Sequence, residues 1–93
     1  MQYYKTRKLA QEKIKKMIVS KVINDGINLK MNTLYLDIGM EFGLGKKQVD
    51  DFVLLFMNKW DNLIKFETFE FKDGTSGKMI VKVEQIQEVD QDE

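Results

Sequence analysis

The stretch YLDIGMEFGLGKKQVDDFVL, from Tyr35 to Leu54, decides how the rest of the chain is interpreted. Two of its three glycines, Gly39 and Gly43, are four residues apart. Gly39 leaves room for a second helix to cross closely, and Gly43 supplies the positive φ that ends a helix and turns the chain. The apolar residues around them lie where two packed helices would bury them: Ile38, Phe42, Leu44, Val49 and Phe52. This stretch therefore predicts two short helices joined by a tight turn.

The chain before this stretch is predicted to form a helix and a very short strand. Apolar residues recur every three or four positions over residues 8–24, and Asn24-Asp25-Gly26 is typical of a helix end. The buried stripe is expected at Ala10, Ile14, Met17, Ile18 and Val22. Residues 27–31 alternate apolar and polar side chains, as a short strand does. Asn32 or Thr33 is the expected cap of the next helix.

The chain after the turn is predicted to form a helix and a hairpin. The helix is expected from about Lys46 to Trp60, burying Val49, Phe52, Val53, Phe56 and Trp60. Residues 63–71 and 78–86 are rich in β-branched and aromatic side chains, and the glycine-containing segment between them indicates a β-hairpin. Phe66 falls on the opposite face from Phe69 and Phe71 unless a bulge intervenes.

The predicted elements occur in the order helix, short strand, helix, turn, helix, hairpin. This α+β order resembles the winged helix-turn-helix family over about residues 8–86. The chain is also similar to small winged-helix proteins of archaeal plasmids and viruses, including PadR-like plasmid segregation proteins. The resemblance implies a single domain over residues 1–86 that binds double-stranded DNA, as a transcriptional repressor or a plasmid partition factor. Residues 87–93 are acidic and are expected to form a disordered tail.

The residue inventory limits the chemistry that this chain can perform. Cysteine and histidine are both absent, which removes disulfides, thiolate metal sites and the commonest general base. No nucleophile is paired with a base, and no carboxylates have metal-ligand spacing, so we expect no enzyme, no metal site and no cofactor. No apolar run reaches about eighteen residues, and the start of the chain lacks a signal-peptide pattern. We therefore expect a cytoplasmic protein, associated with the nucleoid or a plasmid.

The charges of the chain are unevenly distributed. The formal net charge is 0, but residues 1–83 carry fifteen bases and ten acids, a net charge of +5. Residues 84–93 carry five acids and no base. A basic body with a short acidic tail is compatible with a nucleic-acid partner.

The resemblance implies that the helix beginning at Lys46 enters the major groove. The expected DNA contacts on this helix are Gly45, Lys46, Lys47, Gln48 and Asp51. The glycine leaves the first helical amides open to phosphate, while lysine, glutamine and aspartate side chains can reach guanine, adenine and cytosine edges respectively. Asp50 is expected to face solvent or to pair within the helix with Lys46 or Lys47.

The hairpin would then be the wing, lying along the DNA backbone or in the minor groove. Its expected contacts are Lys72, Gly74, Thr75, Ser76 and Lys78. The alternative for its two lysines is simple solvation, because basic residues are common beside exposed turns. Basic residues of the first helix, Arg7, Lys8, Lys15 and Lys16, can add phosphate contacts, although a solvated face is favoured.

A homodimer on a palindromic site is expected, because a single winged domain contacts few base pairs. The expected interface lies at the start and along the first helix: Tyr3, Tyr4, Leu9, Val19 and Ile23. PadR-like proteins usually dimerise through a C-terminal helix, and we expect no such helix in the short, acidic stretch after Ile86. Leu54 and Leu55 fall outside the buried stripe of their helix, so the wing, the first helix or a partner is expected to cover them.

The alternative function is a winged-helix protein-interaction module that does not bind DNA. The zero net charge, the carboxylates of Asp50 and Asp51 on the presumed DNA-contacting face, and the apolar pair Leu54 and Leu55 favour it. The acidic tail is a second candidate surface for a protein partner.

Overall fold

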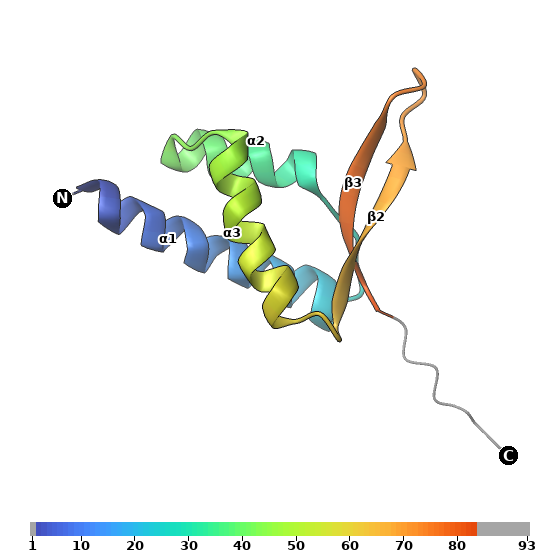
Figure 1. The fold of residues 1–93 in the computed structure, drawn as a ribbon, viewed down its shortest axis with the longest axis horizontal. Coiled ribbons are helices and arrows are strands. Elements are labelled where there is room, and N and C mark those ends of the chain that lie inside the picture. Colours follow the sequence, from blue (N-terminus) through green and yellow to red (C-terminus); the bar gives the residue numbers. More distant parts are fainter. Residues whose placement is uncertain (1, 84–93) are drawn as a thin grey trace, which may run out of the picture.

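The computed structural model describes the backbone of residues 2–83 and the side chains of residues 5–83. Its helices are α1 (Gln2–Met17), the π-helix η1 (Ile18–Asn24), α2 (Met31–Phe42) and α3 (Lys46–Lys59). Its strands are β1 (Leu29–Lys30), β2 (Ile64–Glu70) and β3 (Ser76–Lys82), which form an antiparallel sheet in the order β1-β3-β2. The fold is therefore α+β, and its element order is compatible with a winged-helix-like fold. The helices form the body, and the β2–β3 hairpin extends away from it (Figure 1).

The first helical segment ends at Asn24 as predicted, but its start and the helix type of its last part differ from the prediction. It begins at Gln2 rather than near Lys8, and its last seven residues are π-helical. Four apolar side chains four residues apart are fully buried: Ala10, Ile14, Ile18 and Val22. An α-helix has 3.6 residues per turn, so a spacing of four drifts around its surface. The wider turns of η1 offset this drift and keep the last two side chains directed into the core.

The second helix begins earlier than predicted. Lys30 is its N-cap, with extended backbone and no side-chain capping hydrogen bond, so the expected cap at Asn32 or Thr33 is wrong. Leu29 and Met31 are both buried, and this packing starts the helix directly at the edge of the sheet. Tertiary packing thus overrides the local preference for a polar cap.

The two glycines of the turn have different roles. Gly43 has a φ of 69° and ends α2 in the left-handed conformation, as predicted. A Cβ on Gly39 would lie 2.9 Å from the carbonyl oxygen of Leu44, whose amide donates a hydrogen bond to the Gly39 carbonyl at 3.1 Å. Gly39 therefore makes room for the backbone of the turn, and the expectation of a second helix at this position is wrong.

The core lies between α1, α2, α3 and one face of the sheet. In α2, Leu34 and Ile38 are buried. In α3, Val49, Phe52, Val53 and Met57 are buried. Phe56 and Trp60, expected in the core, are half-buried and stack on each other at 5.3 Å at its edge. The helical spacing thus identified the correct face of α3, while Met57 was missed.

The hairpin has an unbroken register from Ile64↔Lys82 to Glu70↔Ser76, without the bulge that the sequence left open. Phe66 consequently pairs with Ile80 on the core side, whereas Phe69 pairs with Gly77 on the other face. The loop at the tip spans residues 71–75, where the Phe71 amide bonds the Thr75 carbonyl at 2.7 Å. Residues 84–93, including the predicted end of the second strand and the acidic tail, lie outside the described residues.

Candidate nucleic-acid interface

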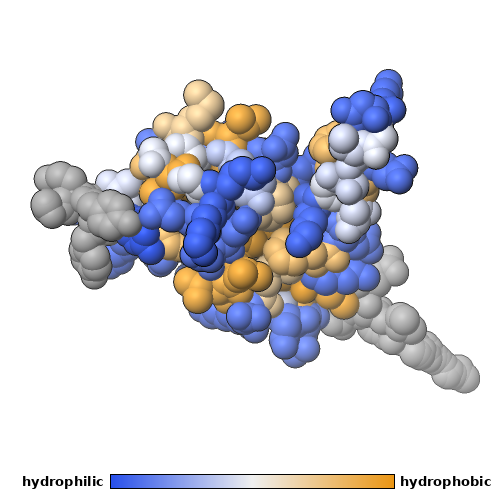
Figure 2. Space-filling view, turned by 45° about the horizontal axis from the view of Figure 1, so that its top comes forward, coloured by the Kyte–Doolittle hydropathy of each residue, from blue (hydrophilic) through white to orange (hydrophobic). Residues whose placement is uncertain are grey.

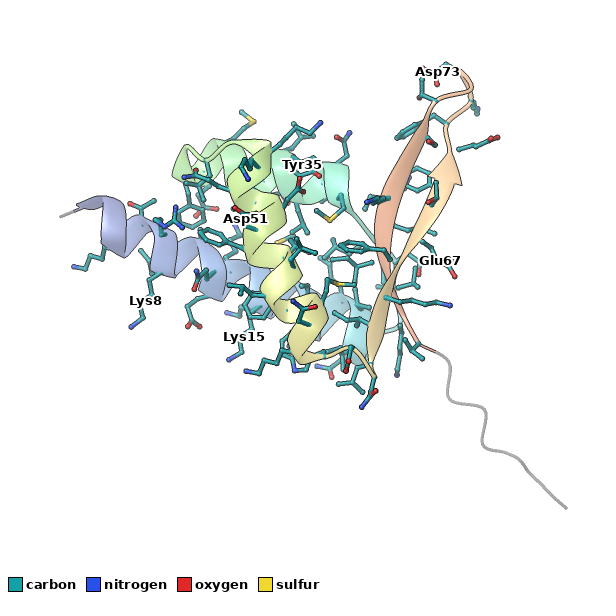
Figure 3. All side chains as sticks on the ribbon, viewed as in Figure 1. Lys8, Lys15, Tyr35, Asp51, Glu67 and Asp73 are labelled. Carbon is teal, nitrogen blue, oxygen red and sulfur yellow. The ribbon has the colours of Figure 1, made fainter. Side chains whose placement is uncertain are left out.

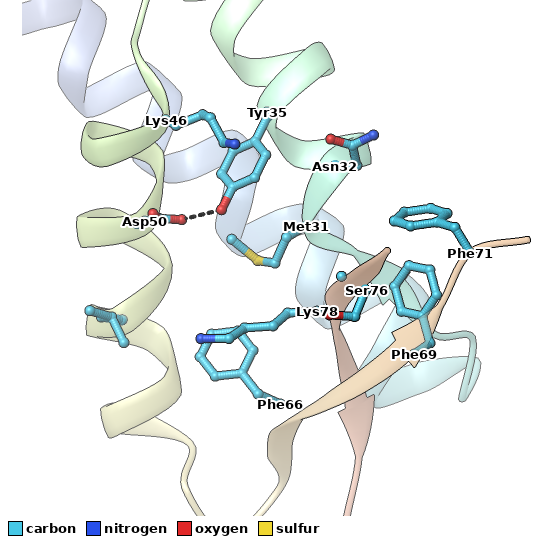
Figure 4. Close-up of a pocket in the computed structure, with 12 residues that line it drawn as sticks. Met31, Asn32, Tyr35, Lys46, Asp50, Phe66, Phe69, Phe71, Ser76 and Lys78 are labelled. Carbon is cyan, nitrogen blue, oxygen red and sulfur yellow. Dashed lines mark hydrogen bonds between the residues drawn. The ribbon is translucent and has the colours of Figure 1, made fainter. Parts of the chain in front are cut away.

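The N-terminal half of α3 and the wing border a common cleft of about 420 Å³. The N-terminal part of α2 closes one end of this cleft (Figure 4). Its aromatic and large apolar lining consists of Met31, Tyr35, Leu54, Phe66, Phe69 and Phe71. Figure 2 shows hydrophilic side chains over α3 and the outer wing, with apolar side chains between and below them. The lining of the cleft therefore combines these rings and apolar side chains with the polar side chains of Asn32, Lys46, Asp50, Ser76 and Lys78.

The start of α3 is open, as the sequence analysis expected. Gly45 is the N-cap with extended backbone, and nothing lies within 4 Å of the position that a Cβ would occupy there. Lys46 and Lys47 are both exposed. Gln48 is half-buried and already interacts with another group of the protein. The Nζ of Lys46 lies 5.0 Å from the centroid of the Tyr35 ring, so this ammonium group is held at the cleft wall.

Asp50 has a different partner from the one expected. Its carboxylate accepts a hydrogen bond of 2.5 Å from the Tyr35 hydroxyl, which ties α3 to α2 (Figure 4). Burial first, and then this hydrogen bond and the negative charge of Asp50, raise the pKa of Tyr35 to about 12. The expected pairing within α3 is therefore replaced by a bond between helices. Asp51 is exposed on the same helix.

The expected wing residues divide into two groups. Ser76 and Lys78 line the cleft, and the Nζ of Lys78 lies 5.5 Å from the centroid of the Phe66 ring. Lys78 thus lines the same cleft as α3 rather than flanking the tip. Lys72, Gly74 and Thr75 are exposed at the tip.

The wing tip carries a carboxylate that the sequence analysis missed. Asp73 accepts hydrogen bonds from the amide and the hydroxyl of Thr75, at 3.0 and 2.7 Å. These bonds hold the pKa of the Asp73 carboxyl below its usual range. Thr75 therefore organises the turn, and its hydroxyl hydrogen is committed there. An aspartate followed by glycine in a hairpin loop is a known turn signal that could have identified this role.

A pair of aromatic rings on the wing was also missed as a functional feature. Phe69 and Phe71 contact each other edge to face, with centroids 4.9 Å apart. The Nζ of Lys30, at the end of β1, lies 5.0 Å from the centroid of the Phe69 ring. The broken alternation of the strand was the signal, because it placed these two rings away from the core.

The predicted dimer residues are only partly accessible. Leu9 is 56% exposed and Val19 is half-buried, whereas Ile23 packs against the core. Ile23 is thus mainly a core residue. The side chains of Tyr3 and Tyr4 lie outside the described residues.

The basic face of α1 is not uniformly solvated. The guanidinium of Arg7 lies 4.9 Å from the centroid of the Phe52 ring, so it packs against α3. Lys13 forms an ion pair with Glu41 that joins α1 to α2. Lys8, Lys15 and Lys16 are exposed. Figure 3 shows Lys8 and Lys15 pointing away from the wing tip and from the start of α3.

Besides Leu9 on α1, apolar side chains are exposed on α2 and α3. Leu54 and Leu55 on α3 are 48% and 55% exposed, and Leu54 lines the cleft. Neither the wing nor α1 covers these two leucines fully. Leu36 and Met40, one turn apart on α2, are also exposed, Met40 by 81%. This second pair was not identified from the sequence.

Comparison with protein-family models, with curated proteins and with solved structures gives no match to the chain. The family resemblance therefore stays a prediction that rests on the element order and the two-glycine turn. Within residues 2–83, the longest helices are too short or too polar to cross a bilayer. Over the same residues, no three carboxylates come close enough together to hold a metal ion.

Proposed function

We propose that this protein binds double-stranded DNA, with the N-terminal half of α3 in the major groove and the wing against the adjacent backbone. The observation that carries the proposal is the open, exposed start of α3 at Gly45, Lys46 and Lys47, which borders the same cleft as the wing. Helix N-termini and exposed lysines both attract phosphate.

The individual residues would make different contacts. Lys46 is held beside the Tyr35 ring and would contact phosphate at the edge of the groove. Lys47 is exposed and free to reach a guanine edge, and Gln48, one residue on, would pair with adenine. Lys72 at the wing tip would add a backbone contact that raises affinity without selecting bases.

We further propose a homodimer on a palindromic site, acting as a transcriptional repressor or a plasmid partition factor in the cytoplasm. Leu9 and Val19 are the accessible members of the expected interface. Such a dimer would double the number of base pairs contacted and the number of phosphates neutralised.

The test starts with selection of bound duplexes from a random pool, followed by affinity measurements on the selected site. Replacing Lys47 and Gln48 by Ala should abolish the site preference, because these side chains would touch the bases. The control is the pair Lys15→Ala and Lys16→Ala, which removes two exposed charges from the last turn of α1. The control protein should keep the site preference. If preference survives the Lys47 and Gln48 changes, α3 does not read the bases.

The second candidate function, a protein-interaction module, is favoured by the exposed apolar pair Leu36 and Met40 on α2. A salt titration separates it from DNA binding. Duplex affinity should fall steeply between roughly 50 and 200 mM salt if several phosphates are contacted, because counterions are released on binding. A protein that binds no duplex at either salt concentration is not a DNA-binding protein, and the proposal then fails.

A further inference from the structure

The rings of Phe69 and Phe71 lie beyond the core, although both line the cleft. Phe69 is half-buried and Phe71 is 39% exposed, and neither belongs to the cluster of side chains that packs the body. Exposed aromatic rings add little to stability. Their position on the wall of the cleft, across from Asn32, gives them a surface that a flat ligand can reach (Figure 4).

The wing backbone is shaped to hold these rings. A Cβ on Gly77 would lie 3.2 Å from carbon atoms of both Phe69 and Phe71. The absence of a side chain at Gly77 therefore lets both rings lie close against β3. Rings held against a strand do not project as a wedge between stacked bases, but they can receive a base on their free surface.

Lysine side chains lie beside aromatic rings in or next to the cleft: Lys30 beside Phe69, Lys46 beside Tyr35 and Lys78 beside Phe66. Each of these lysines places its Nζ 5.0 to 5.5 Å from the ring centroid. Among the described residues that line the cleft, Asp50 is the one carboxylate, and it already accepts the Tyr35 hydroxyl. The cleft is therefore cationic at its rim and aromatic within, which complements a nucleotide: phosphate outside and base inside.

We propose that the cleft receives a base that is already unpaired in the bound DNA, and that this base packs on Phe69 and Phe71 while its flanking phosphates lie near the three lysines. The volume of about 420 Å³ falls within the roughly 300–1,000 Å³ range of small-ligand sites. The inference rests on the proposed function, because α3 and the wing bring the DNA to the cleft. It adds that the protein prefers DNA in which a base is already unpaired, since the unstacking cost is then absent.

The test compares two duplexes of the same sequence, one perfect and one with a single bulged adenine within the bound site. The full-length protein should bind the bulged duplex about tenfold more tightly, near the low end of the range for base–aromatic stacking. Replacing Phe69 and Phe71 together by Leu should bring the ratio of the two affinities to about one. The same double variant should keep its affinity for the perfect duplex within about twofold, because it retains every lysine.

Two further variants distinguish loss of the aromatic surface from loss of the folded structure. Gly77→Ala keeps both rings but pushes them from the strand, so it should also lower the preference for the bulge. Phe56→Leu is the matched control, because it removes an aromatic ring that stacks on Trp60 outside the cleft. It should leave the preference unchanged. Thermal melts by circular dichroism establish that each variant is folded before its affinities are compared.

The outcomes distinguish this inference from the function on which it rests. Equal affinity of the unchanged protein for the two duplexes, with perfect-duplex binding intact, overturns the base site and leaves the proposed function standing. A preference for the bulge that survives both the Phe69/Phe71 change and Gly77→Ala also overturns it. Failure to bind any DNA overturns the proposed function, and this inference with it.

Discussion

The helical body and the wing are specified in different ways. The centre of the body is packed with fully buried side chains, among them Ile14, Ile38 and Val49. In the wing, β2 buries Ile64 alone, and its outer half is held by strand register and by the turn at Asp73. Burial makes the body intolerant of change, whereas the wing can carry exposed rings and charges. The wing can therefore offer side chains for binding with little loss of packing in the fold.

The difference in packing between the body and the wing is tested by truncating one apolar side chain in each region and comparing the losses of stability. Ile38→Ala should cost about 2–5 kcal/mol, because it leaves a cavity among fully buried neighbours. Phe71→Ala should cost less than about 1 kcal/mol, although it removes a larger side chain. Urea unfolding followed by circular dichroism measures both. Similar losses for the two variants would show that the wing is as tightly packed as the body.

The turn between α2 and α3 offers a second comparison, between two glycines six residues apart. Gly39→Ala should destabilise by about 2 kcal/mol, because its Cβ would meet the Leu44 carbonyl oxygen at 2.9 Å and the backbone must shift. Gly45→Ala is the control, because open space surrounds that position, and it should cost less than about 1 kcal/mol. The midpoints of urea unfolding measure both changes. A Gly39→Ala protein that is more stable than the unchanged protein would contradict the close contact between residue 39 and the Leu44 carbonyl oxygen.

The bond between Tyr35 and Asp50 gives a smaller effect with a characteristic pH dependence. Tyr35→Phe should cost about 1 kcal/mol at neutral pH, the usual contribution of such a hydrogen bond. The pKa of Tyr35 rises from 10.0 to about 12 on folding, so the folded chain keeps the proton longer than the unfolded chain. The resulting stability is fully present below pH 10 and is lost as the pH rises toward 12.

The pH dependence is measured as the difference in unfolding free energy between the unchanged protein and Tyr35→Phe. This difference should shrink between pH 10 and pH 12, because only the unchanged protein has the tyrosine at this position. All other side chains are the same in both proteins, so their contributions cancel in this difference. Parallel curves over this window would contradict the link between Tyr35 and Asp50.

Side-chain spacing was sufficient to predict most of the body. The helix that carries Ile14 and Val22 and the turn at Gly43 depend on interactions between residues that are close in the sequence. They could therefore be predicted from the sequence alone. Helix starts were less predictable, because burial of Met31 outweighed the capping preference of Asn32. The relevant forces there act between residues that are distant in the chain.

The candidate interface was predictable in its location but not in its partners. The exposed lysines at the start of α3 follow from helix position alone. The Tyr35 partner of Asp50 and the orientation of Lys78 toward Phe66 depend on how α2, α3 and the wing pack against each other. The aromatic surface over Gly77 depends on strand register, which imperfect alternation left undecided.

The left-handed backbone at Gly43 also has a stereochemical consequence. Gly43 has a φ of 69°, which is strained for an L residue but is the preferred helical conformation of a D residue. Nothing lies within 4 Å of the position that a Cβ would occupy there. At 93 residues the chain is within reach of chemical synthesis and ligation. A synthetic chain with D-alanine at this position should fold unchanged. It should gain about 0.4–1 kcal/mol in urea unfolding, because the unfolded chain loses conformational freedom.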